Sequence, residues 1–372
     1  MMINKLTFGG LFILSCTFAS AQQLARVQEK GLVGFINKDG SFQITPQFKN
    51  AHDQSEGKIA VYDGSRWGFV DKDANYIIQP QYVNAKSFSQ GMAMVKSASG
   101  WLYIDSLGQE LKSISSKRVY EFNDGVAFYR DATNLVGLIN NKQEVVLPPT
   151  YDVIRPFKDG YAKVAKNKKW GIIDNQGKEV IAPNYDDIGD FNVGLVWAKK
   201  QNNWFLVSGQ KEIALPGISK IDHIENADFI LVQQGNKIGF IDSDGKWLIP
   251  ATYDDARNFQ EGLAPVKLNG KWGYIDTTGK MVIPTAYQDA LSFSPEGLAA
   301  VKDSKWGFID KNAKVIIPFQ YEITAALTFK KQEKGFIDGL ARVKLNGKWG
   351  FIDTKGNLLG NKWFDNAELF QN

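Results

Sequence analysis

The sequence predicts an all-β fold, a tandem array of ten units of about 34 residues with three short antiparallel strands each. Seven of the nine intervals between copies of a Trp-Gly pair are 34 residues. Each unit also has glycines and, in most units, a proline, among β-branched and aromatic runs, which excludes the paired helices that share this period. The Trp-Gly positions, some degenerate, are 33, 67, 101, 136, 170, 204, 238, 272, 306 and 349.

The first strand of each unit is the Trp-Gly-Phe-Ile segment, followed by a turn. An aspartate stands four residues after the Trp position in most units, and in six units a glycine follows three residues after that aspartate or after the asparagine, Asn37, that replaces it. An Asx side chain can bond the backbone two residues on, and glycine supplies a positive φ, so we expect a tight hairpin here. The aspartates are Asp71, Asp105, Asp174, Asp242, Asp276, Asp310 and Asp353.

The second strand is the Val-Ile-Pro segment, and we expect its proline to end the strand because proline cannot donate to a ladder. These prolines are Pro80, Pro148, Pro183, Pro250, Pro284 and Pro318. The third strand is Gly-Leu-Ala-x-Val-Lys. Ala264 and Val266 share one face of it, opposite Lys267.

These motifs resemble the WG-repeat family, bacterial β-repeat proteins often found behind export signals. The Trp-Gly-Phe-Ile-Asp-x-x-Gly core is nearly intact in five copies, and the resemblance covers residues 24–370. The copies at 204 and 238 depart most from it. The resemblance implies all-β tandem units and an interaction role, and it brings no catalytic residue set with it.

The ends of the chain bear on how the array is arranged. Leu24–Val27 repeats Leu340–Val343, so the array starts with a third strand and stops before another. We expect one array over residues 22–372, with an open, superhelical stack of units. The alternative is a closed, propeller-like ring in which the two ends meet. About nine extra residues near 329–338 predict a surface loop, either a binding loop or tolerated growth.

Residues 1–21 predict an export signal, with Lys5 before an apolar run and a small-x-small cleavage site ending at Ala21. The alternative is lipidation at Cys16 within a lipobox-like Ile-Leu-Ser-Cys segment. After cleavage we expect a periplasmic or extracellular protein that does not span the membrane. On this prediction the mature chain has no cysteine and depends on its core for stability.

Composition argues against most chemical functions. The 44 basic and 40 acidic side chains give a net charge of +4, which does not favour nucleic-acid binding. His52 and His223 lie 171 residues apart, and Cys16 is the single cysteine. The segment after Asp71 faintly resembles a calcium loop, but Tyr76 and Tyr82 stand where that loop needs Gly and Glu. We therefore predict no enzyme activity, catalytic residue, cofactor or metal, and assign the aspartates to turns.

Two further columns have both a structural and a binding interpretation. Seven of the ten tryptophans lie on the repeat position, where we expect core packing; a sugar-stacking platform is the alternative. Trp247 is also expected to be buried, whereas Trp197 and Trp363 are expected at the surface. Basic residues that follow the apolar residue of the third predicted strand of the unit indicate either a solvated strand edge or an anion-binding stripe. They are Lys96, Arg130, Lys199, Lys267, Lys302 and Lys344.

The sequence thus predicts a non-enzymatic envelope or secreted protein that presents an extended β surface to a protein partner. The alternative function is binding of peptidoglycan or a surface polysaccharide. An exposed apolar patch would favour a protein partner, and solvent-facing aromatic rings in a row would favour sugars.

Overall fold

The computed structural model describes residues 23–111, 120–322 and 335–371. The predicted export signal and most of the predicted insertion lie outside the described residues. Within these ranges no helix is long and apolar enough to cross a membrane. The all-β prediction is confirmed, and the described residues contain only one short 3-10 helix, η1 (Leu359–Asn361).

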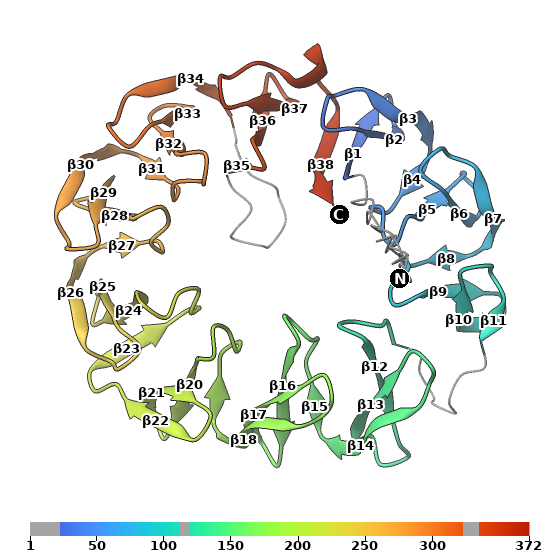
Figure 1. Ribbon diagram of the computed structural model, residues 1–372, viewed down its shortest axis with the longest axis horizontal. Helices are drawn as coiled ribbons and strands as arrows, with labels where there is room; N and C mark the ends of the chain where they lie inside the picture. Colours follow the sequence, from blue (N-terminus) through green and yellow to red (C-terminus); the bar gives the residue numbers. More distant parts are fainter. Residues whose placement is uncertain (1–22, 112–119, 323–334, 372) are drawn as a thin grey trace, which may run out of the picture.

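The chain forms ten small antiparallel sheets, or blades, arranged as a closed ring (Figure 1). The open stack is therefore wrong, and the closed alternative is what the structure shows. Eight blades have four described strands and two have three, so the prediction of three strands per unit missed one. The missed strand is the short inner one, which in most blades follows the outer strand of the preceding blade.

The strands of each blade are named from the centre outwards, and the blades are numbered 1 to 10 in the order of their second strands. Blade 1 has the C-terminal strand as its inner strand; no inner strand is described for blade 4 and no outer strand for blade 10. The inner strands are β38 (Asn366–Gln371), β4 (Asn50–Ala51), β8 (Asn84–Ala85), β15 (Val153–Ile154), β19 (Asp187–Ile188), β23 (Ile218–Ile221), β27 (Asp255–Ala256), β31 (Asp289–Ala290) and β35 (Phe336–Ile337). The second strands are β1 (Leu24–Glu29), β5 (Ile59–Tyr62), β9 (Met92–Ser97), β12 (Val126–Arg130), β16 (Tyr161–Lys166), β20 (Val196–Lys200), β24 (Ile230–Gln234), β28 (Leu263–Leu268), β32 (Ala299–Lys302) and β36 (Leu340–Leu345).

The third and outer strands complete the blades. The third strands are β2 (Leu32–Ile36), β6 (Trp67–Val70), β10 (Gly100–Asp105), β13 (Val136–Asn140), β17 (Lys169–Asp174), β21 (Asn203–Ser208), β25 (Lys237–Ile241), β29 (Lys271–Asp276), β33 (Trp306–Ile309) and β37 (Lys348–Asp353). The outer strands are β3 (Phe42–Phe48), β7 (Tyr76–Tyr82), β11 (Glu110–Leu111), β14 (Val145–Tyr151), β18 (Glu179–Tyr185), β22 (Lys211–Ala214), β26 (Trp247–Tyr253), β30 (Met281–Tyr287) and β34 (Val315–Tyr321).

The core lies between the blades rather than within one continuous layer. One buried cluster joins Trp67 and Phe69 of blade 2 to Phe88 and Val95 of blade 3, and similar clusters occupy the other junctions. Phe69 meets Phe88 edge to face, with ring centroids 4.8 Å apart. Because each unit buries its faces only against its neighbours, a lone unit would leave both faces in water.

Ring closure uses contacts that recur at other junctions. Strand β38 pairs with β1 in the antiparallel direction, so the C-terminal strand completes the sheet of the first blade (Figure 1). Phe351 of blade 10 packs on Phe370 of β38, with ring centroids 4.9 Å apart. Asp365 forms an ion pair with Lys348 and accepts the backbone N–H of Lys30 at 2.8 Å. Closure thus covers the faces that an open stack would expose.

The prolines do not end the second predicted strand of the unit. In blade 8, β30 runs through Pro284 and ends at Tyr287, and the register shifts opposite β29 on either side of Tyr274. Proline is tolerated because β30 is the edge of its sheet, where a missing N–H breaks no ladder.

Candidate functional site

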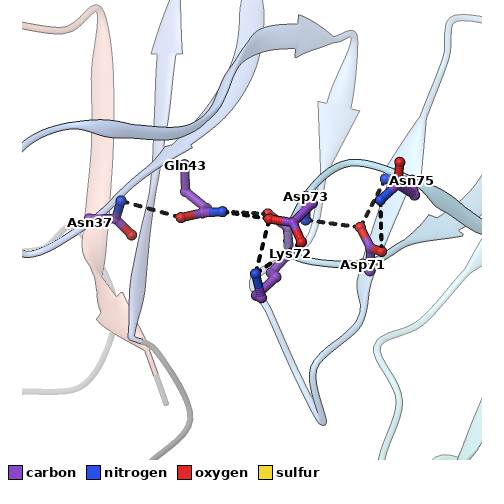
Figure 2. A network of polar contacts seen from close by, with 6 residues as sticks. All are labelled: Asn37, Gln43, Asp71, Lys72, Asp73 and Asn75. Atoms are coloured by element: carbon purple, nitrogen blue, oxygen red, sulfur yellow. Dashed lines mark hydrogen bonds and ion pairs between the residues drawn. The ribbon is translucent and has the colours of Figure 1, made fainter.

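The aspartate column forms turns. The Oδ1 atom of Asp71 accepts the backbone N–H groups of Asp73 and Asn75, both at 2.9 Å (Figure 2). Burial raises the pKa of Asp71, but hydrogen bonds from Asn75 and Asp73 outweigh burial and leave it below its usual value. The same pair of backbone bonds is made by Asp71, Asp105, Asn140, Asp174, Asp242, Asp276, Asp310 and Asp353.

These turns also connect neighbouring blades. The Gln43 side chain of blade 1 donates to Asp73 Oδ1 at 2.9 Å and to the Lys72 carbonyl oxygen at 3.2 Å (Figure 2). Asn37 in turn donates to Gln43 at 3.3 Å. The network holds two turns together and is occupied by protein atoms. Among the residues that the structure describes, no group of three or more His, Cys, Asp or Glu could hold a metal ion.

The two histidines lie in different blades. The His52 ring stacks on Trp67, with centroids 4.8 Å apart, and its Nε2 lies 3.0 Å from the Ala85 carbonyl oxygen of the next blade. Because a carbonyl oxygen can only accept, Nε2 carries the proton. Burial is the main cause that lowers the pKa of His52. His223 follows β23 in blade 7 and is half-buried. The structure does not bring them together.

The repeat-position tryptophans are packed between blades, as predicted. Trp67, Trp204, Trp272 and Trp349 are buried, and the other three are partly exposed. The expectation for the remaining three was wrong. Trp247 is 39 % exposed because it begins an outer strand, whereas Trp197 and Trp363 are half-buried against hydrophobic clusters.

The basic column does not guard a strand edge. Its residues lie on second strands, which are paired on both sides in the four-stranded blades, and each faces the Trp position across the ladder. Only Lys96 is exposed, and the other five members are half-buried. Lys199 Nζ lies 4.9 Å from the ring centre of Trp204, a cation–π contact. Arg130 Nε donates to the Tyr120 hydroxyl at 3.1 Å. Lys199 and Lys344 therefore contact repeat-position tryptophans, whereas Arg130 faces Val136.

Sequence reasoning missed the exposed apolar side chains of the outer strands. We define the outer strip as Trp247, Leu248, Val282 and Val315, which lie on β26, β30 and β34 of three successive blades (Figure 1). Their side chains are between 39 and 45 % exposed. Pro250, Pro284 and Pro318 on the same strands are exposed as well. The two-residue alternation of a strand could have indicated Leu248 and Val282, which neighbour a buried isoleucine. It could not have indicated Trp247 and Val315, which stand two residues before one, where the register shifts.

Three lysines border the outer strip. Lys246, Lys280 and Lys314 each stand directly before an outer strand, and all three are exposed. None of them makes an ion pair with any residue in the described ranges. The strip is therefore an apolar surface with a positive border. It differs from the other exposed apolar side chains of outer strands, such as Tyr76 and Ile77 on β7 and Val145 on β14, because it extends over three successive blades.

The comparisons support the fold. A crystal structure of a eukaryotic initiation factor superposes with a TM-score of 0.53 at 11 % identity, over 95 % of this chain and 98 % of that chain. At this identity the match shows the fold alone. PorZ, a surface component of the type-IX secretion system of Porphyromonas gingivalis, gives a TM-score of 0.28 at 11 % identity, over 85 % of this chain and 44 % of that chain.

A third structure is the extracellular domain of a candidate one-component system, BT4673, of B. thetaiotaomicron. It gives a TM-score of 0.30 at 10 % identity, over 94 % of this chain and 65 % of that chain. The last two superpositions are too distant to support an inference. No curated protein matches the chain.

The family profile described as WG containing repeat matches eight segments. They are residues 34–66, 67–101, 137–170, 170–204, 238–272, 272–304, 306–324 and 334–349. These segments cover more than half of the chain, and most run from the third strand of one blade to the second strand of the next. The chain belongs to the WG containing repeat family.

Proposed function

We propose that this protein is an exported, non-enzymatic interaction protein that binds a protein partner through the outer strip. Export is supported by the signal-like features of residues 1–21. The observation that carries the proposal is the exposure of Trp247, Leu248, Val282 and Val315 on three neighbouring blades. Grouped apolar side chains at a surface, rimmed by polar residues, mark protein interaction sites.

The lysine border defines the chemistry of the partner. Lys246, Lys280 and Lys314 favour a surface that combines apolar and acidic side chains. The edge prolines disfavour a partner that adds a β-strand, since Pro250, Pro284 and Pro318 interrupt the donors such a strand would need. The partner therefore docks by side-chain contacts.

Glycan binding is the alternative that the experiment must separate. Among the described residues the large exposed aromatic side chains are Tyr76 and Trp247, on blades 2 and 7, and they do not form a row. The buried repeat-position tryptophans are not available as a sugar-stacking platform.

The test is a pull-down with residues 22–372 from an envelope extract of the source cell, with and without protease digestion. We expect to capture a protein, and we expect capture to be lost after digestion of the extract. Capture should also be lost when the immobilised protein carries both Leu248→Asp and Val282→Asp, and it should be weaker at high salt. The matched control is Ile77→Asp with Val145→Asp, equally exposed side chains on separate blades. Capture that survives digestion and is competed by a soluble polysaccharide would support glycan binding instead.

A further inference from the structure

A cavity of 260 Å³ opens at the junction of blades 3 and 4. It is separate from the outer strip, because its lining residues lie on β9 and β10, in the segments that follow β4 and β8, and in the segment before β12. Its polar lining includes His52, Ser87, Ser89 and Tyr103. Its apolar wall is formed by aromatic rings and two flexible thioether side chains, and its rim bears one cation and one anion. The residues concerned are Phe88, Met92, Met94, Phe122, Lys86 and Glu121.

The two charges at the rim face each other across the junction. Lys86 Nζ of blade 3 lies 3.0 Å from Glu121 Oε1 of blade 4, and the side chains are 40 % and 55 % exposed. An ion pair this exposed contributes little to stability, because water and salt screen it. Breaking the pair so that each side chain can contact a ligand therefore costs little free energy.

The junction of blades 5 and 6 shows why the cavity exists. There Lys163 Nζ and Asp190 Oδ1 form a similar pair at 2.9 Å, but the cavity beside it is only 20 Å³. Tyr161 and Phe191 fill that space, with ring centroids 4.6 Å apart. Register places Met92 where blade 5 has Tyr161, since Met92 pairs with Asp105 as Tyr161 pairs with Asp174. The same register places Met94 where blade 5 has Lys163, so two flexible thioether side chains stand in the open cavity where the filled junction has a tyrosine ring and a lysine.

We propose that this cavity binds a free α-amino acid with a large apolar side chain. The carboxylate of the ligand pairs with Lys86 and its ammonium group with Glu121, while its side chain enters the space lined by Met92, Met94 and Phe122. In a free amino acid the ammonium and carboxylate groups are attached to the same carbon. Their close spacing matches that of Lys86 and Glu121, which lie in direct contact. The volume lies just below the range of pockets for drug-sized ligands, and so fits a ligand of amino-acid size.

The charge pattern also excludes related ligands. A carboxylate without an ammonium group would meet the negative Glu121, and an amine without a carboxylate would meet the positive Lys86. A residue inside a peptide has neither charge. The site therefore distinguishes the free amino acid from the same side chain presented by a protein.

The test is calorimetric titration of residues 22–372 with L-phenylalanine, L-methionine and L-leucine. We expect saturable binding of at least one, and a Kd weaker by about tenfold or more for its N-acetyl and its amide derivatives, each of which lacks one charge. Met92→Tyr, which copies blade 5, should abolish binding, and Glu121→Gln should weaken it by about tenfold. Asp190→Asn is the matched control at the closed junction and should leave the Kd unchanged.

Three outcomes would overturn the proposal. The first is no binding of any of the three amino acids up to about 10 mM. The second is equal binding of the zwitterion and both blocked derivatives, which would mean that the cavity recognises only a side chain, such as one from a peptide. The third is unchanged binding by Met92→Tyr in a variant whose thermal unfolding matches the parent protein.

Discussion

At the residue scale, the glycine of each Trp-Gly pair is required by the outer strand beside it. A Cβ atom on Gly273 would lie 2.5 Å from the Ile283 carbonyl oxygen, closer than real contacts allow. The same clash, at 2.4 to 2.7 Å, would occur at Gly34, Gly68, Gly137, Gly171, Gly239 and Gly307. Blade 10 differs because Gly350 faces the side chains of Leu358 and Trp363 at 2.9 Å. The pair is thus a packing motif in which glycine admits the neighbouring backbone.

Substitution of this glycine should destabilise the ring. We expect Gly273→Ala to lower the free energy of unfolding by about 1–3 kcal/mol, the usual cost of overpacking. Gly350→Ala is the matched control, and its loss should be smaller because side chains can move aside where a backbone carbonyl cannot. Urea-induced unfolding followed by tryptophan fluorescence measures both. Equal losses would contradict the close-approach explanation.

Buried tyrosines should make the protein sensitive to alkali. Burial raises the pKa of Tyr103 to about 12, although the backbone N–H of Tyr120, which donates to the Tyr103 hydroxyl oxygen at 3.3 Å, opposes this. Burial likewise raises the pKa of Tyr274 well above its usual value. The unfolded chain ionises near pH 10, so the stabilisation is complete below pH 10 and is lost as the pH rises towards 12.

The measurement is the urea midpoint between pH 9 and pH 12, with conditions chosen so that unfolding stays reversible. We expect the midpoint to fall above about pH 10. Tyr103→Phe should make that fall shallower, because phenylalanine cannot ionise. The same steepness in the variant and the parent protein would show that Tyr103 is not responsible.

At the element scale, the outer strands carry the exposed edges of all the described four-stranded blades. An unpaired strand edge is a template for aggregation, and proline is one of the residues that blocks it. Pro250, Pro284 and Pro318 interrupt three successive edges that also expose apolar side chains. The prolines therefore let these strands keep an apolar surface without pairing edge to edge.

Removal of these prolines should cause self-association. We expect the triple variant Pro250→Val, Pro284→Val and Pro318→Val to form larger species in sedimentation velocity, because it regains three backbone donors on apolar edges. The β-sheet content measured by circular dichroism should remain that of the parent protein. Pro216→Val, in the connection after β22, serves as the control substitution outside an outer strand. A monomeric triple variant would mean that the edges are protected in another way.

At the scale of the whole molecule, ring closure joins the two ends of the described chain. Gln28 of β1 is paired with Asn366 of β38, and Asp365 donates its backbone N–H to the Gln28 carbonyl oxygen at 2.9 Å. The junction repeats contacts that other junctions also have. Asp186, for example, forms an ion pair with Lys169 of blade 5 and accepts the backbone N–H of Gln201 of blade 6 at 2.8 Å.

A disulfide can report closure directly. We expect residues 22–372 with Gln28→Cys and Asn366→Cys to form an intramolecular cross-link on oxidation, seen as faster migration without reductant. A protein with Gln28→Cys and Asn84→Cys is the control, because Asn84 holds the equivalent inner-strand position in blade 3. Failure of the first pair to cross-link, or linking of both pairs, would contradict the closed ring.

Features that depend on contacts between neighbouring residues can be predicted from the amino-acid sequence alone. The period, the aspartate turns and the glycine at each close approach could be predicted because a few neighbouring residues settle them, as Asp71 and Gly273 illustrate. Family membership follows from the same local motifs. The seven repeat-position tryptophans were also placed correctly in the packing between units.

Features that depend on contacts between units could be learned only from the tertiary structure. Closure rests on the pairing of β1 with β38, which lie at opposite ends of the described chain. The position of a strand within its blade decided that Pro284 is tolerated and Trp247 exposed. The cavity beside Met92 depends on which side chain faces it across a junction. Such pairings are set by the angle and register between sheets, which no single unit encodes.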